Sequence, residues 1–278
     1  MSYIKKLPYV RKREILEMIK DSDCVDIAEL SKRFEVSQMT IHRDLRELEE
    51  SGEVSRVYGG AKAVIRQNSA PMPSQGADAA LIQTDLTIEE RFLQSLEYKQ
   101  SIAAKAAELV HDDDVIAMDP STTTLHMCSY LKHKNISVVT PSLSVALQFS
   151  NTKNVQVILL GGTLRKSSLS VVGTQMNDML DWLVINKYFL SSHAFSFESG
   201  LTDYKLDEAE VKRNLIASSQ KVYVMVDHTK INRQASYVAC NYRNIDTVFT
   251  DSENYMDERQ LECLKKYEDA GVKVIYSM

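Results

Sequence analysis

The chain has 278 residues, of which 44% are hydrophobic and 26% charged, and its net charge is −5 at pH 7. This is the composition of a soluble globular protein, and the length favours two domains of ordinary size. No run approaches the roughly 18 apolar residues that a membrane-spanning helix needs, so we expect a cytoplasmic protein. The four cysteines and six histidines show no zinc-ligand spacing, so we expect neither a metal nor a cofactor.

Charge and composition divide the chain into regions. Residues 1–66 carry a net charge of +1 and the remainder −6, and the basic residues of the first region are locally grouped. A small DNA-binding module needs a basic face rather than an overall positive charge. Residues 67–85 lack periodic apolar residues and gather Ser, Pro and Gly, as inter-domain linkers do. We therefore predict a DNA-binding domain at 1–66, a linker at 67–85 and a larger domain at 86–278.

Two amphipathic segments follow one another in the first region. Residues 26–34 and 37–50 have apolar residues at three- and four-residue spacings, which predicts two helices joined by a tight turn at 35–36. Ser37 is a good N-cap and marks the start of the second helix. Apolar positions of this helix share one face: Ile41, Leu45 and Leu48. The outward residues are Met39, His42, Arg43 and Arg46.

An outward row with two arginines suits a recognition helix in the major groove, although a solvated helix face has the same pattern. The next segment favours DNA binding. Residues 54–64 contain two short β-like runs that meet at Gly59 and Gly60, which is a strong hairpin signal. A hairpin directly after a helix-turn-helix is a wing, and Arg56, Lys62 and Arg66 would let it contact phosphates or the minor groove.

The run at 37–60 (SQMTIHRDLRELEESGEVSRVYGG) resembles the signature of the DeoR family of bacterial regulators. The resemblance implies a winged helix-turn-helix that binds double-stranded operator DNA. It departs from the family at His42, where arginine is common. The residues expected to contact DNA are Ser37, Gln38, Met39, Thr40, His42, Arg43, Arg46, Arg56 and Lys62.

Downstream of the linker, short β-rich runs alternate with helical segments. The expected strands are 115–118, 136–139, 155–160, 188–191, 221–226, 246–249 and 273–277. This alternation predicts a largely parallel sheet with helices on both faces. Ligands of such sheets bind at the carboxyl ends of the strands, and polar residues follow nearly every run. The polar segments are 119–124, 140–142, 161–165, 192–193, 227–230 and 250–251.

Residues 121–124 all carry hydroxyl groups and stand at the start of a predicted helix. Free backbone N–H groups and the helix dipole favour an anion there, although Ser121 or Thr122 could simply cap the helix. Lys230 could supply a cation for a phosphate. Neither GxxxxGK[ST] nor GxGxxG is present, which argues against nucleoside triphosphates and dinucleotides. The expected ligand is a phosphorylated sugar or polyol.

This region also resembles the DeoR family, in its sensor half. The matching stretches are 97–109, 119–124, 138–145, 160–164, 170–173, 200–202, 208–213, 227–230 and 250–251. The resemblance implies a Rossmann-like α/β domain similar in fold to ribose-5-phosphate isomerase and CoA transferases. The implied effector-binding residues are Asp119, Ser121, Thr122, Thr123, Gly162, Glu208, Lys212 and Lys230. The resemblance further implies that the protein forms a dimer or tetramer. Because family members mostly repress, it also implies a repressor of genes of carbohydrate metabolism.

Two other functions compete with this interpretation. The larger domain could isomerise or deaminate a sugar phosphate with Asp119 or Glu208 as general base, but the sequence offers no complete acid–base set. The winged helix could instead bind a protein, although its outward arginines favour DNA. We therefore expect a regulator and not an enzyme.

Overall fold

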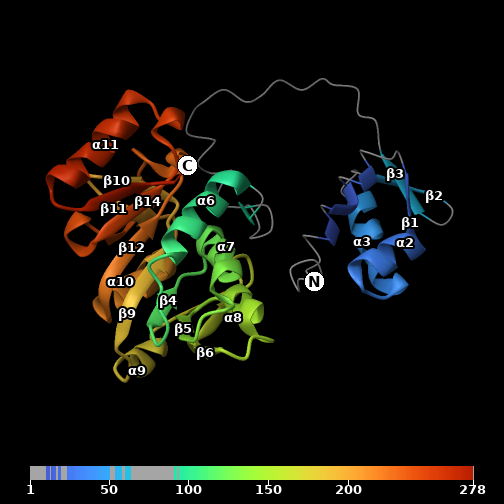
Figure 1. The fold of residues 1–278 in the computed structure, drawn as a ribbon, viewed down its shortest axis with the longest axis horizontal. Coiled ribbons are helices and arrows are strands. Elements are labelled where there is room, and N and C mark those ends of the chain that lie inside the picture. Colours follow the sequence, from blue (N-terminus) through green and yellow to red (C-terminus); the bar gives the residue numbers. More distant parts are fainter. Residues whose placement is uncertain are drawn as a thin grey trace. The chain divides into compact units, whose positions relative to one another are not determined.

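The computed structural model describes residues 11–12, 14–16, 18–19, 24–50, 54–57, 60–63, 91–92 and 94–277. The chain divides into two compact units, Met1–Gly76 and Ala77–Met278 (Figure 1). The linker predicted at 67–85 lies outside the described residues. No helix within the described ranges is long and apolar enough to cross a membrane.

Two helices of the first unit confirm the predicted helix-turn-helix. Helix α2 (Ile27–Phe34) is capped by Asp26, whose carboxylate accepts the N–H groups of Ala28 and Glu29 at 2.8 and 3.1 Å. Helix α3 (Gln38–Glu50) begins directly after Ser37, whose hydroxyl accepts the N–H of Thr40 at 3.2 Å. Because Ser37 satisfies an N–H that the helix itself cannot bond, it sets the start of the second helix.

The hairpin after the helices has the predicted form of a wing. Strands β2 (Val54–Val57) and β3 (Gly60–Ala63) pair antiparallel. A third strand, β1 (Cys24–Asp26), pairs with β3, and its three residues are too few to show an alternating pattern in the sequence. A Cβ atom at Gly60 would lie 1.9 Å from the carbonyl oxygen of Val25. Only glycine therefore fits at this position of β3, where β1 pairs with it.

The core of the first unit includes a charged pair among its apolar side chains. Arg11 and Asp44 are 1% and 0% exposed. The Nε and Nη2 atoms of Arg11 donate to the two carboxylate oxygens of Asp44 at 2.5 and 3.0 Å. This two-bond geometry fixes the residues around Arg11 against α3.

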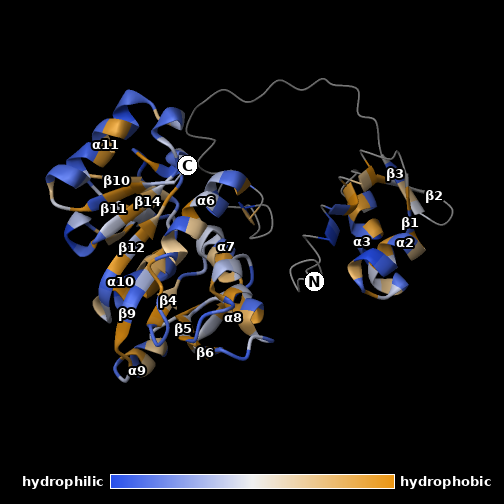
Figure 2. Ribbon diagram, in the orientation of Figure 1, coloured by the Kyte–Doolittle hydropathy of each residue, from blue (hydrophilic) through white to orange (hydrophobic). Residues whose placement is uncertain are grey.

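The second unit is built on a seven-stranded sheet in the order β15-β14-β12-β9-β4-β5-β6. Every pairing in it is parallel. Its strands are β4 (Val115–Met118), β5 (Ile136–Thr140), β6 (Val155–Leu159), β9 (Ile185–Leu190), β12 (Ser219–Met225), β14 (Thr247–Thr250) and β15 (Lys273–Tyr276). All seven strands predicted from the sequence are present, with ends shifted by a few residues. Figure 2 shows hydrophobic residues concentrated in this sheet, as expected of strands covered on both faces.

Helices cover both faces of the sheet. On one side α6 (Leu96–Ala107), α7 (Thr122–Leu131) and α8 (Leu143–Phe149) lie next to one another (Figure 1). On the other side α10 (Leu206–Ala217) and α11 (Glu258–Asp269) share a buried cluster with alternate sheet residues such as Tyr188 and Leu190. Phe189, between those two, points to the opposite face because successive side chains of a strand alternate. A short helix, α9 (Met176–Leu180), precedes β9.

Two small antiparallel sheets complete the second unit. One contains β10 (Ala194–Ser196), β11 (Gly200–Asp203) and β13 (Tyr237–Cys240) in that order, and the other is the hairpin of β7 (Thr163–Arg165) and β8 (Ser170–Val172). Single-turn 3₁₀ helices follow three strands: η2 (His228–Lys230), η3 (Tyr242–Asn244) and η4 (Glu253–Tyr255).

We predict that Asp44→Ala destabilises the first unit by about 3–5 kcal/mol, because it leaves a buried guanidinium without its carboxylate. The matched control is Glu47→Ala, which removes the exposed ion pair with Lys12 and should cost about 0–1 kcal/mol. Amide hydrogen exchange across α3 in the full chain measures both changes. Equal protection of α3 in the two variants would show that the buried Arg11–Asp44 pair contributes no more to stability than the exposed Lys12–Glu47 pair.

Candidate functional site

Helix α3 buries the apolar residues that the sequence places on its inner face and exposes the predicted outer face. Ile41 and Leu45 are fully buried, whereas Met39 is 76% exposed. Arg43 and Arg46 are exposed and His42 is half-buried. The helix therefore presents one long apolar side chain and two guanidinium groups to solvent.

The remaining predicted DNA-contacting residues flank this face. Ser37 and Gln38 are exposed, Thr40 is half-buried, and the hydroxyls of Ser37 and Thr40 lie 2.9 Å apart. Lys62 is exposed on β3. Arg56 belongs to β2, but its side chain lies outside the described residues, as do Gly59 and Arg66.

A pocket of the second unit lies where the strand order of the sheet reverses. From β4 the chain proceeds outward through β5 and β6 and then returns to the other side of β4 with β9. Connections leave such neighbouring strands in opposite directions, which opens a crevice at their carboxyl ends. Asp119 follows β4 and spans the crevice, because its Oδ2 accepts the N–H of Ser191, which follows β9, at 3.0 Å.

Seven of the eight residues predicted to bind the effector line this one pocket. They are Asp119, Ser121, Thr122, Thr123, Glu208, Lys212 and Lys230. Gly162 does not line it. Its φ is +146°, and a Cβ atom there would lie 2.4 Å from the carbonyl oxygen of Val172. The close approach of the β7–β8 hairpin therefore explains this glycine.

Lys212 on α10 joins two buried carboxylates at the base of the pocket. Its Nζ donates to Asp203 at 2.7 Å and lies 3.8 Å from Asp119. Burial alone would raise the pKa of Asp203, but Lys212 and His193 outweigh it and hold that pKa below its usual range. Burial likewise opposes the charge on Lys212, yet the two carboxylates raise its pKa. Asp119 is farther from the ammonium, and burial raises its pKa.

Two other lysines in the pocket have no carboxylate partner among the described residues. Lys99 on α6 is 5% exposed, and its Nζ donates to the carbonyl oxygen of Arg91 at 2.5 Å. Burial lowers the pKa of Lys99 to about 8 and also lowers that of Lys230. The guanidinium of Arg91 lines the same pocket, and its buried Nε has no hydrogen-bond partner. A buried ammonium without a carboxylate partner is costly, so this end of the pocket is prepared for an anion.

The start of α7 faces the same space. Ser121 caps the helix, since its hydroxyl accepts the N–H of Thr124 at 3.2 Å, which is the simpler of the two roles considered for it. Thr122 and Thr123 are buried in the first turn and line the pocket. Capping by Ser121 leaves the other N–H groups of the first turn available, and the helix dipole adds partial positive charge there.

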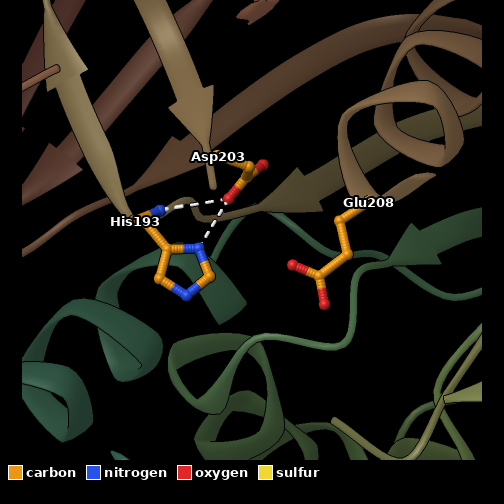
Figure 3. A group of neighbouring side chains, drawn as sticks. All are labelled: His193, Asp203 and Glu208. Carbon is orange, nitrogen blue, oxygen red and sulfur yellow. Dashed lines mark hydrogen bonds and ion pairs between the residues drawn. The ribbon is translucent and has the colours of Figure 1, made fainter. Parts of the chain in front are cut away.

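A histidine and two carboxylates meet at another part of the pocket wall (Figure 3). The Nδ1 atom of His193 lies 2.8 Å from Oδ1 of Asp203, and Glu208 approaches the imidazole ring from α10. Candidate ligand atoms of the three side chains lie within 4.8 Å of one another. Arg165 binds Asp207 at 2.6 Å and lies 3.7 Å from Glu208.

Several pocket residues were not predicted. Lys99 occupies an alanine-rich helix, where a lysine normally indicates an exposed position. Nothing in the local sequence distinguishes the buried Lys99 from an exposed lysine of the same helix, such as Lys105. Asp203 ends an antiparallel strand rather than a parallel one, so the rule about strand ends does not select it. Arg91 lies outside every motif. His193 does follow a predicted strand, and this position at a strand end is the feature that could have identified it as a ligand-binding residue.

Comparisons with known proteins agree with this architecture. Residues 11–67 match the model of the DeoR-like helix-turn-helix domain, and residues 94–252 match that of the DeoR C terminal sensor domain. The second range includes most of the pocket residues.

Whole-length relatives are named as regulators. The chain is 33% identical to HTH-type transcriptional regulator GlpR of Haloferax volcanii, over 97% of this chain and 98% of that protein. It is 29% identical to HTH-type transcriptional regulator GolR of Listeria innocua, over 96% and 98%. It is 28% identical to the lactose phosphotransferase system repressor of Staphylococcus aureus, over 91% and 95%.

Among solved structures, ribose 5-phosphate isomerase A of Methanocaldococcus jannaschii has a TM-score of 0.36 and 14% identity. The match spans about half of each chain, 48% of this one and 52% of the isomerase. The β subunit of eIF2B from Chaetomium thermophilum has a TM-score of 0.41 and 13% identity, over 62% and 53%. The two family models and the whole-length relatives show that this chain belongs to the DeoR family of DNA-binding transcriptional regulators.

Proposed function

We propose that this protein represses genes of carbohydrate metabolism and that a phosphorylated sugar or polyol, bound in the pocket of the second unit, modulates its binding to operator DNA. One observation carries the proposal. Lys99 and Lys230 are two cations in one pocket, and neither has a carboxylate within 4.0 Å among the described residues. A phosphate monoester supplies the missing negative charge.

The arrangement of donors supports phosphate over a single carboxylate. Lys99, Lys230 and Arg91 offer three cationic groups, and the first turn of α7 adds backbone N–H groups. A phosphate dianion has three terminal oxygens and two charges, so it can accept from several of these donors at once. Carboxylates carry less charge and fewer oxygens.

The pocket favours binding over catalysis. Asp119, the first candidate for a general base, is fully buried, and both of its oxygens already accept hydrogen bonds from Ser121, Thr124 and Ser191. A carboxylate held in this way is engaged in positioning the loops around it. The relatives over the whole length are also named as regulators.

The exposed face of α3 supports the other half of the proposal. We propose that Arg43 and Arg46 contact bases or phosphates in the major groove and that Lys62 contacts the backbone near the wing. A dimer or tetramer held together by second units would fix the spacing of two such heads. Ligand binding in the pocket would change that spacing, and the two binding events would then be reciprocally coupled. Because operators are chromosomal, we expect this action in the cytoplasm.

We predict that Arg43→Ala weakens operator binding by roughly 1–3 kcal/mol, since a side chain that reads a base contributes about that much. The operator is a fragment selected by the wild-type protein from random DNA, and fluorescence anisotropy gives the affinity. Lys153→Ala, which removes an exposed lysine from the second unit, is the matched control and should bind as wild type does. An unchanged affinity of the Arg43 variant would refute the proposed docking.

We predict that Lys99→Met weakens binding of inorganic phosphate at least tenfold, because it removes a cation from the pocket and leaves a side chain of nearly the same size. The pKa of Lys99 is lowered to about 8, so the ammonium is present below that pH and lost above it. Wild-type affinity should therefore fall roughly fivefold between pH 8 and 9, and the variant should show a flatter profile. Calorimetric titrations measure both.

The control for this experiment is Lys105→Met, which removes an exposed lysine of the same helix that pairs with Glu108. It should leave phosphate affinity and its pH profile unchanged. If the Lys99 and Lys105 variants bound phosphate equally well, the anion site would lie elsewhere.

A further inference from the structure

We infer that the far ring nitrogen of His193 and the carboxylate of Glu208 form a subsite that selects ligands with neighbouring hydroxyl groups. The inference rests on the proposed function and extends it from the phosphate to the rest of the ligand. His193 is not among the residues that the sequence predicts to bind the effector.

The protonation of the imidazole ring follows from its partner. Asp203 is fully buried and donates nothing, because Lys212 at 2.7 Å keeps it ionised. A carboxylate only accepts hydrogen bonds, so the Nδ1 atom of His193, 2.8 Å away, must carry a proton. In the neutral ring the other nitrogen, Nε2, is then an acceptor.

The backbone holds this ring in place. Ala194 of β10 pairs with Thr202 of β11, so the next residues along the hairpin, His193 and Asp203, face each other. The backbone N–H of His193 also donates to Asp203, at 3.2 Å, and the ring of Tyr204 packs edge-on at 5.3 Å. Nε2 therefore has a fixed direction, away from Asp203 (Figure 3).

Glu208 places a second acceptor beside the first. Its carboxylate lies next to the imidazole in Figure 3, and the two side chains line both the main pocket and a smaller adjoining hollow. Among the described residues, neither Nε2 of His193 nor the Glu208 carboxylate receives a hydrogen bond, and Arg165 comes no nearer to Glu208 than 3.7 Å. Two adjacent acceptors without donors suit a ligand that brings two donors.

The local charges favour neutral donors over a cation. Lys212 already occupies one oxygen of Asp203 and the His193 proton the other, and Arg165 partly compensates Glu208. A divalent metal bound by all three side chains would have to displace the proton that Nδ1 of His193 donates to Asp203, and it would sit near Lys212. Hydroxyl groups need no such rearrangement, because they donate to Nε2 and to Glu208 as these stand.

Both kinds of group line the same pocket. Lys99 and Lys230 provide the anion-binding cations, and His193 and Glu208 provide the acceptors. The ligand class is therefore a phosphate monoester of a polyhydroxylated chain or ring, and alkyl phosphates without hydroxyl groups should bind less well.

The test compares butyl phosphate with ribose 5-phosphate, glucose 6-phosphate and sorbitol 6-phosphate by calorimetric titration of the full chain. We expect the wild type to bind butyl phosphate. We expect it to bind at least one of the three hydroxylated phosphates at least tenfold more tightly than butyl phosphate. His193→Phe should reduce that preference below threefold and change butyl phosphate affinity less than twofold. His193→Gln, whose amide oxygen can replace the Nε2 acceptor, should restore part of the preference.

His133→Phe, at an exposed histidine outside the pocket, is the matched control and should keep the full preference. If wild type bound all four phosphates alike, or His193→Phe kept the preference, the hydroxyl subsite would be overturned while the anion site stood. If no phosphate bound, butyl and inorganic phosphate included, the proposed function would fail and this inference with it. One-to-one binding of Zn²⁺ or Mn²⁺ that His193→Phe abolishes would replace the subsite by a metal site.

Discussion

The contact between Lys212 and the carboxylates of Asp203 and Asp119 is the interaction on which the second unit's pocket depends. These three side chains come from α10, β11 and the loop after β4, so one ammonium joins three separate elements. All three side chains are buried, and removal of Lys212 would leave two buried carboxylates without their ammonium partner. The pairing thereby fixes the strand ends around the pocket and keeps Asp203 ionised, which in turn orients His193.

That network explains why the pocket has two different parts. Near Lys212, which neutralises the buried carboxylates, the pocket wall presents two hydrogen-bond acceptors, Nε2 of His193 and the carboxylate of Glu208. The hydrogen bond to Asp203 fixes the orientation of the first. Lys99 and Lys230 have no described carboxylate at ion-pair distance, and around them the wall presents positive charge and the start of a helix. A ligand that fits must carry negative charge at one position and hydrogen-bond donors at another, which is the chemistry of a sugar or polyol phosphate.

Much of this could be predicted from the sequence because strand ends and helix starts are local features. Asp119, Ser121 and Lys230 follow predicted strands, and the parallel sheet brings such positions to one edge. Pairings between distant segments could not be predicted in this way. The contact of His193 with Asp203 depends on an antiparallel register, and Lys99 enters the pocket only because α6 packs beside α7. In the first unit, β1 was missed because three residues carry no periodic signal.

The central claim is that occupancy of the pocket by a phosphorylated ligand changes the affinity of the DNA-binding unit. The most direct measurement is operator affinity, by fluorescence anisotropy, at increasing concentrations of the sugar phosphate that raises the thermal stability of the protein most. The account predicts that operator affinity changes at least fivefold at saturation and that Lys99→Met needs at least tenfold more of the same ligand to reach the same change. Equal operator affinity with and without bound ligand would contradict it.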